Sequence, residues 1–145
     1  MVKNGEIQFD DVDEWRTDPN LEIGDGLDID FAGGKFITVH RAGGRNVAYQ
    51  RAIAAIPPRK LKRLSAVDDR ELMIKVYVET VVIGWRGWKS GGKEMPFTPD
   101  NVSALFRGYA DIFMEVMSKA SGGENFLIEK DGDTAKNSEA LSAGQ

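Results

Sequence analysis

Residues 85–101 (WRGWKSGGKEMPFTPDN) constrain the fold most, because they place two tryptophans and a phenylalanine in a loop rich in Gly, Lys and Pro. The end of this loop has the composition of a helix start. Thr98 is a good N-cap, Pro99 suits the first helical position, and Asp100 puts negative charge near the positive end of the helix dipole. The stretch predicts a connection between two helices, whose large rings either hold the helices together or face a partner.

Two apolar segments flank this loop. Residues 68–85 open with acidic residues and continue with β-branched ones. Because this segment is longer than a usual strand, we expect a helix that is buried over much of its circumference. Residues 99–120 are the clearest helix, with a wide apolar stripe at i, i+3, i+4 and i+7. A third helix is expected at residues 45–56, before a Pro-Pro pair, and residues 59–67 leave room for another turn or two.

A β-hairpin is expected over residues 27–41. Apolar and acidic residues alternate at its start, two glycines supply a tight turn, and residues 35–41 are rich in β-formers. An isolated hairpin is marginally stable, so it must pack on the helices or extend a sheet. The sequence therefore predicts an α+β fold, mainly α, in which the hairpin packs on three to four helices within one globular domain, residues 21–121.

Both ends of the chain are expected to lie outside this domain. Residues 1–20 are acidic and sparsely apolar, which predicts a mobile arm anchored by Phe9, Val12 and Trp15, three residues spaced like one face of a short helix. An exposed tryptophan in such an arm usually docks onto its own domain or onto another chain. Residues 122–145 are polar and predict a largely disordered tail.

Charge is distributed unevenly along the chain. The net charge is −8 over residues 1–30, +7 over residues 31–75 and −3 over residues 76–145. Internal pairing of the acidic and basic parts is the preferred interpretation. The basic run at residues 59–63 (RKLKR) does not by itself predict nucleic-acid binding, because the sequence pI is near 5.1 and the run contains a leucine. A solvated helix face, or a docking site for an acidic chain such as residues 1–30, is favoured.

No arrangement of residues predicts an enzyme. The chain has no cysteine and one histidine, His40, at the end of a predicted strand. Lys93 follows two glycines but precedes Glu94, so the phosphate-loop spacing is not met. Three aspartates lack the geometry of a calcium loop: Asp25, Asp28 and Asp30. We therefore expect no catalytic residue, no cofactor and no metal.

The N-terminus and the lengths of the apolar segments indicate where in the cell the protein acts. The N-terminus is acidic and lacks the apolar run of a secretory signal. No stretch approaches the roughly 20 apolar residues that span a bilayer. A cytosolic protein without a membrane partner is expected.

A set of short motifs follows one another between residues 85 and 138. A tryptophan–glycine pair is followed by a Gly/Lys insertion, a proline–phenylalanine helix start, an apolar helix, an Asn-Phe pair and a K-N-S ending. Here these are residues 85–88, 89–94, 96–101, 102–117, 125–126 and 135–138. This ordered set resembles the tail assembly chaperones of long-tailed bacteriophages, the lambda-like G-protein type. The doubled tryptophan, the acidic arm and the basic middle depart from that pattern, which leaves the partner details open.

The resemblance implies a non-catalytic protein that binds the phage tape-measure protein, keeps it soluble and helps recruit tail-tube subunits. It also implies residence in the host cytoplasm and absence from the mature virion, with self-association left open. A binder of a long apolar client needs exposed apolar surface. Trp88 is the preferred exposed ring, whereas Trp85 and Phe97 serve equally well as core. The full set of expected partner-binding residues is Trp85, Trp88, Phe97, Phe106 and Tyr109.

Two other functions remain open at this stage. A structural virion subunit, of the tail-terminator or connector type, would use the hairpin to extend a neighbour's sheet and oligomerise. An acidic inhibitor would mimic nucleic acid through residues 1–30, but the basic middle of the chain disfavours it.

Overall fold

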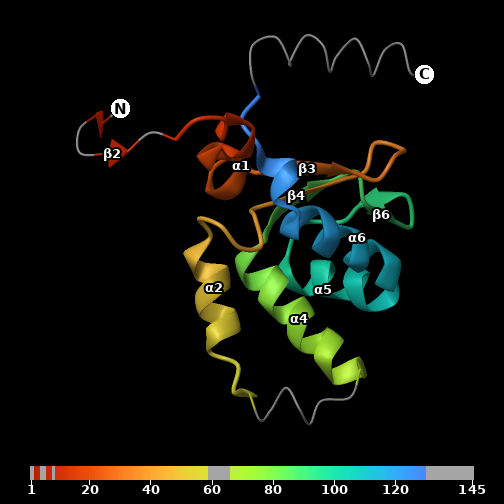
Figure 1. The fold of residues 1–145 in the computed structure, drawn as a ribbon. Coiled ribbons are helices and arrows are strands. Elements are labelled where there is room, and N and C mark those ends of the chain that lie inside the picture. Colours follow the sequence, from red (N-terminus) through yellow and green to blue (C-terminus); the bar gives the residue numbers. More distant parts are fainter. Residues whose placement is uncertain (1, 4–5, 8, 59–65, 130–145) are drawn as a thin grey trace.

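The computed structural model describes residues 2–3, 6–7, 9–58 and 66–129 (Figure 1). A small antiparallel sheet lies at one end of a group of helices, and the predicted class, α+β and mainly α, is confirmed. The elements are β1 (Val2–Lys3), β2 (Glu6–Ile7), η1 (Asp13–Trp15), α1 (Pro19–Ile23), β3 (Leu27–Asp30), β4 (Phe36–Val39), α2 (Val47–Ala54), α4 (Ala66–Thr80), β5 (Val82–Arg86), β6 (Lys89–Ser90), β7 (Lys93–Glu94), α5 (Pro99–Gly108), α6 (Ala110–Ser121) and η2 (Gly123–Phe126).

The main sheet has the order β3-β4-β5, and all its pairs are antiparallel. Ile37 on the central strand faces Ile29 on one side and Trp85 on the other. This face is buried against the helices. The opposite face is polar, as is common for antiparallel sheets, and carries a hydrogen bond from Thr38 to Asp28 and an ion pair between Asp28 and Arg86.

The helix expected over residues 68–85 is wrong in its last part. Helix α4 ends at Thr80, and residues 82–86 form the edge strand β5. The β-branched residues there gain a strand partner in β4, a tertiary pairing that sequence length alone cannot reveal. Asn46 provides a hydrogen-bond partner for a carbonyl at the end of this helix, because its side-chain amide donates to the Thr80 carbonyl at 2.8 Å.

The single helix expected over residues 99–120 is also wrong. The chain breaks at Tyr109 (φ −136°, ψ 83°), which separates α5 from α6. The preceding Gly108 is a poor helix former. In a straight helix Phe106 and Phe113 would lie about 10 Å apart along the axis. The break instead brings their ring centroids to 4.9 Å.

The folded part extends beyond the expected domain at both ends. The polar tail expected over residues 122–145 is wrong for its first part, because η2 forms there and Phe126 is fully buried. The Asp18 N–H donates to the Phe126 carbonyl at 2.7 Å, and Thr17 pairs with Leu127. The segment just before α1 and the chain around η2 therefore hold each other. Residues 130–145 and the basic run at residues 59–63 lie outside the described residues.

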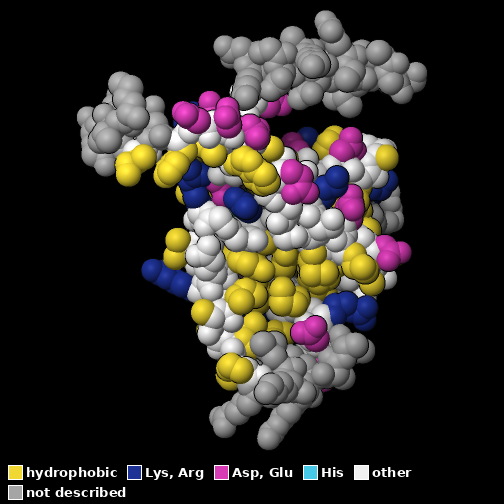
Figure 2. All heavy atoms as spheres, in the orientation of Figure 1, with side chains coloured by type: hydrophobic (Ala, Val, Ile, Leu, Met, Phe, Trp, Pro, Cys, Tyr) yellow, Lys and Arg dark blue, Asp and Glu magenta, His cyan; other side chains and the backbone are white. Residues whose placement is uncertain are grey.

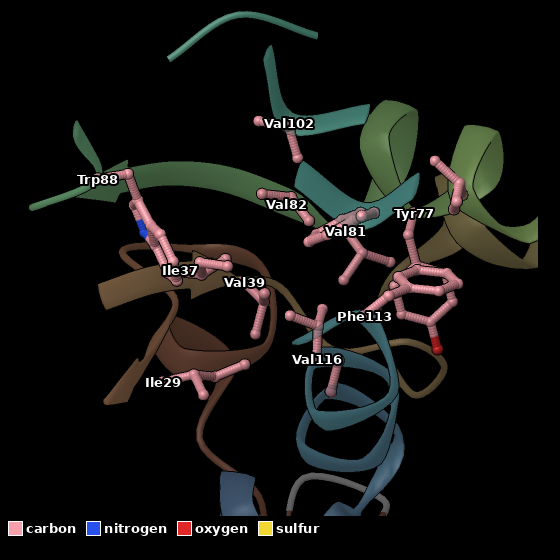
Figure 3. Packing of buried hydrophobic residues seen from close by; sticks show 13 residues of the cluster. Ile29, Ile37, Val39, Tyr77, Val81, Val82, Trp88, Val102, Phe113 and Val116 are labelled. Carbon is pink, nitrogen blue, oxygen red and sulfur yellow. The ribbon is translucent and has the colours of Figure 1, made fainter. Parts of the chain in front are cut away.

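The core joins the sheet to α4, α5 and α6 (Figure 3). Helix α4 packs between α2 and α5, while α6 packs on β3 and β4. Tyr77 of α4 is at the centre of the helical part, with its ring 5.8 Å from that of Tyr49 and 5.5 Å from that of Phe113. Burial raises the pKa of the Tyr77 phenol, helped by the neighbouring Tyr49 hydroxyl.

Gly87 allows the chain to turn from β5 back over the sheet. Its φ is +85°, and a Cβ there would lie 2.0 Å from the Gly34 carbonyl oxygen in the β3–β4 turn. We expect Gly87→Ala to lower the free energy of unfolding by at least about 3 kcal/mol, because backbone strain and a backbone clash add together. Gly91→Ala is the matched control, with φ +58° and open space around it, and should cost about 1 kcal/mol. Urea denaturation measures both; equal losses would contradict the close approach.

Candidate functional site

The structure gathers three of the five expected partner-binding residues and separates the other two. The rings of Phe31, Trp88, Trp85 and Phe97 follow one another in a row, with centroid separations of 5.5, 6.0 and 6.1 Å. The indole N–H of Trp88 donates to the Phe36 carbonyl at 3.0 Å, and that of Trp85 donates to the Met95 carbonyl at 2.9 Å. Buried indoles need such acceptors, so this row fastens the β6–β7 loop to the sheet.

The expectation that Trp88 is the exposed ring is wrong. Its side chain is only 9% exposed, because the turn at Gly87 places it against the sheet near Ile37 (Figure 3). Phe97, at the outer end of the row, is 41% exposed. Phe97 is therefore the member of the row that a partner can reach.

Phe106 and Tyr109 have opposite environments. Phe106 is fully buried against Phe113, so its expected position at the edge of a client surface is wrong. Tyr109 is 63% exposed at the break between α5 and α6. The broken helix explains both outcomes, because it turns the end of the apolar stripe away from the core.

A second apolar surface was not singled out from the sequence. Figure 2 shows apolar side chains gathered over α4, between α2 and α6, without a charged side chain among them. We call this area the α4 face. Apolar residues of these helices that pack on the core and stay partly exposed are Tyr49, Met73, Val78, Ile112 and Met117; of these, Val78 lines a cavity between α4 and α5 instead. Apolar residues at helical spacing in α2 and α4 indicated such a surface. Periodicity cannot show which apolar side of a helix the rest of the protein leaves exposed.

A third surface is the acidic segment, residues 9–15. Phe9, Val12 and Trp15 were expected to anchor it, and this is wrong: the three side chains are 72%, 42% and 76% exposed. Only Asp13–Trp15 form a helical turn. The anchor lies just beyond the segment, at Thr17 and Glu22, so the three apolar side chains are free for other contacts.

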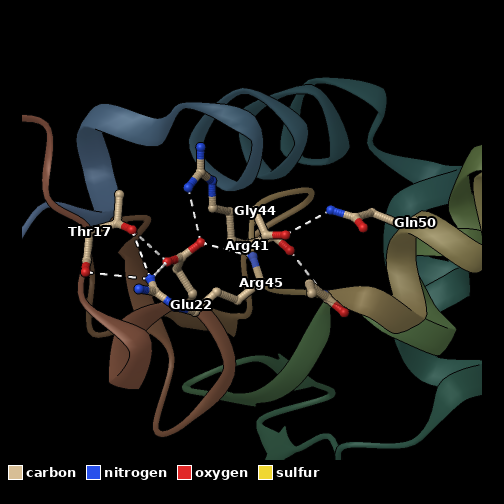
Figure 4. A network of polar contacts seen from close by, with 7 residues as sticks. Thr17, Glu22, Arg41, Gly44, Arg45 and Gln50 are labelled. Atoms are coloured by element: carbon tan, nitrogen blue, oxygen red, sulfur yellow. Dashed lines mark hydrogen bonds and ion pairs between the residues drawn. The ribbon is translucent and has the colours of Figure 1, made fainter. Parts of the chain in front are cut away.

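Glu22 holds the anchor through a buried network (Figure 4). Its carboxylate accepts hydrogen bonds from the Thr17 hydroxyl at 2.7 Å and from Arg41 Nη1 at 2.9 Å. The backbone N–H of Arg45 at 3.1 Å and its Nη1 complete the set. The charge asymmetry of the sequence predicted internal pairing of residues 1–30 with the basic middle, although not through this residue.

Glu22 also has an unusual ionisation. Burial alone would raise the pKa of its carboxyl group. The hydrogen bonds from Thr17 and the two arginines outweigh burial and lower the pKa from 4.5 to about 2. The carboxylate of Glu22 is therefore charged at neutral and mildly acidic pH.

Other classes of site have little support in the described chain. Among the described residues, no group of three or more His, Asp or Glu side chains is placed to hold a metal ion. No described helix is long and apolar enough to cross a membrane.

Comparison with known protein families gave a match. The family model described as YdaY prophage protein matches residues 44–137, which is more than half of the chain. The chain belongs to the YdaY prophage protein family. It is accordingly a phage-derived protein. The family match includes all elements from α2 to η2, whereas the acidic segment, β3 and β4 precede it. No curated protein and no solved structure matched.

The Glu22 network predicts a dependence of stability on pH. Because the native pKa is below the unfolded value, the stabilisation is present above pH 4.5 and is lost as pH falls toward 2. We expect wild type to lose about 3 kcal/mol across this window, and Glu22→Gln to lose a similar amount already at pH 7. The free energy of unfolding, measured by denaturant titration between pH 2 and 7, tests this. Glu94→Gln, at an exposed position, is the control. A Glu22→Gln variant with an unchanged pH profile would contradict the assignment.

The aromatic row predicts a contrast between two tryptophans. Trp88→Ala removes a buried ring and leaves a cavity, so it should lower the free energy of unfolding by about 3–5 kcal/mol. Trp15→Ala removes an exposed ring and should change it by less than about 0.5 kcal/mol. Equilibrium unfolding of both variants measures the difference. Similar values would mean that Trp88 does not pack as described.

Proposed function

We propose that this phage-derived protein is a non-catalytic tail assembly chaperone, which binds the tape-measure protein, keeps it soluble and helps recruit tail-tube subunits. One observation carries the proposal: the α4 face is an apolar surface on a small domain that no described segment of the chain covers. The prophage family and the ordered motifs of residues 85–138 support it. The protein would act in the host cytoplasm and leave before the virion is complete.

The shape of the α4 face suits a helical client. The apolar side chains lie over α4, with α2 on one side and α6 on the other (Figures 1 and 2). An amphipathic helix binds such a surface by laying its apolar side into it. Met73 and Met117 supply flexible, polarisable side chains, which adapt to different client sequences along a long protein.

The exposed aromatic side chains outside this face have a separate place in the proposal. Phe97 and Tyr109 are exposed at the start and at the end of α5. They would provide a second contact, for the tail-tube subunit that the chaperone recruits. Trp85, Trp88 and Phe106 would act indirectly, by maintaining the fold.

Co-expression with the tape-measure protein of the same prophage tests the proposal. Wild type should bring the client into the soluble fraction and co-purify with it. Met73→Gln puts a polar group into the α4 face at a partly exposed position and should reduce soluble client several-fold. Met95→Gln changes a partly exposed methionine in the segment between β7 and α5 and is the matched control.

The folding of the variants must be checked by circular dichroism and thermal unfolding. Met117→Gln is a second variant of the α4 face, in case the first is unstable. Client that stays insoluble with wild type, or that is soluble with both variants of the face, would overturn the proposed binding site.

A structural virion subunit is the second candidate. Strand β3 is an edge of the described sheet, so its outer side could pair with a neighbouring copy. Asp28 and Asp30 are exposed on this strand, and charges on an edge strand disfavour such pairing. Mass spectrometry of purified particles separates the candidates, since only a structural subunit would be present in them.

A further inference from the structure

The acidic segment, residues 9–15, offers apolar and negative surface together. Its three apolar side chains are exposed, and the four residues between them are carboxylates with no basic residue among them. Exposed aromatic rings grouped in this way indicate a contact with another chain. Because the intervening residues are negatively charged, a complementary partner must be both apolar and positively charged.

A cavity beside the segment has the same character. It has a volume of about 540 Å³ and lies between the N-terminal segment and the chain around η2. Trp15 and Leu127 supply apolar wall, while Glu14 and Glu124 supply carboxylates. Arg41 also lines it, but its charge is paired with Glu22 at 2.9 Å. A cation can lie against the face of an indole and pair with a carboxylate at once.

One run of this chain has the complementary chemistry. Residues 59–63 (RKLKR) carry four positive charges around a leucine, against four negative charges in residues 9–15. Leu61 matches the apolar wall of the cavity, and the flanking cations match its carboxylates. The run lies in the connection between α2 and α4, whose described ends are Pro58 and Ala66.

Geometry places this contact between two copies. The carbonyl of Thr80, at the end of α4, accepts a hydrogen bond from Asn46, next to the Glu22 network. Ala66, at the start of α4, is then about 21 Å away along the helix. A seven-residue connection that returns to the same end of the molecule reaches outward by at most about 14 Å. The end of α2 and the start of α4 accordingly lie at the opposite end of the molecule from the acidic segment (Figure 1).

We propose that residues 59–63 of one copy bind the acidic segment and its cavity on a second copy. Leu61 enters between Trp15 and Leu127, and the four cations pair with the surrounding carboxylates. Because the two surfaces differ, the contact is head-to-tail and leaves one free surface at each end. It can therefore repeat into chains or close into rings, independently of any tape-measure client.

Sedimentation velocity of the purified full chain tests this. We expect a weight-average mass that rises with concentration beyond that of a dimer at about 20 mM salt. The association should weaken strongly at about 500 mM salt, where exposed charges are screened. A chain that remains a monomer at high concentration and low salt would overturn the proposal.

A charge exchange makes the test specific. One variant reverses the acidic segment (Asp10→Lys, Asp11→Lys, Asp13→Lys, Glu14→Lys), and the other reverses the basic run (Arg59→Glu, Lys60→Glu, Lys62→Glu, Arg63→Glu). Each variant alone then carries surfaces of like charge and should be a monomer. An equimolar mixture restores opposite charges between copies and should associate again. Circular dichroism checks that both variants fold.

Single substitutions and a control complete the experiment. Trp15→Ala and Leu61→Ala should each weaken association at least several-fold without changing charge. Exposed acids elsewhere, reversed as Glu94→Lys and Glu115→Lys, should leave it unchanged. A mixture that stays monomeric, or variants that associate like wild type, would refute the head-to-tail contact. The tape-measure assay is separate, so the failure of one proposal is distinguishable from the failure of the other.

Discussion

The buried carboxylate of Glu22 is the interaction on which the arrangement of the chain depends. It lies in α1 and accepts hydrogen bonds from Thr17 before this helix and from Arg41 and Arg45 between β4 and α2, so it ties the N-terminal part to the start of the helical part. A buried charge is tolerated only where it is paired and hydrogen-bonded, and here hydrogen bonds from Thr17, Arg41 and Arg45 meet that need. Through Thr17, the same network positions the segment that pairs with the chain around η2.

Much of the fold follows from local pattern. The hairpin lies where alternation and paired glycines place it, and α5 begins at Thr98 as its capping sequence indicates. The two errors in helix length arise where a strand partner or a poor helix former overrides the apolar periodicity. β-branched residues at the end of α4 became a strand because β4 offered a partner, and an uninterrupted apolar stripe hid the break at Tyr109. No periodicity encodes either event.

The candidate surfaces were harder to predict than the fold. Large aromatic residues in a glycine-rich loop suggested exposure, but Trp88 packs on the sheet and its N–H is satisfied. The surfaces that remain exposed are made of less conspicuous residues, such as Met73, or lie in a segment that composition marked as an arm. Exposure depends on which strips of surface the rest of the chain covers, and this becomes known only from the assembled structure.

The pairing of residue 17 with residue 127 has a consequence for synthesis of the protein. A chain emerges from the ribosome with its N-terminal part first. The segment around Thr17 must therefore wait, without its partner strand, while more than a hundred further residues are made. Phe126 reaches its buried position only after α6 has been made. The nascent protein thus stays open at its acidic end until residue 127 has been made, and closure of the fold follows the synthesis of α6 and η2.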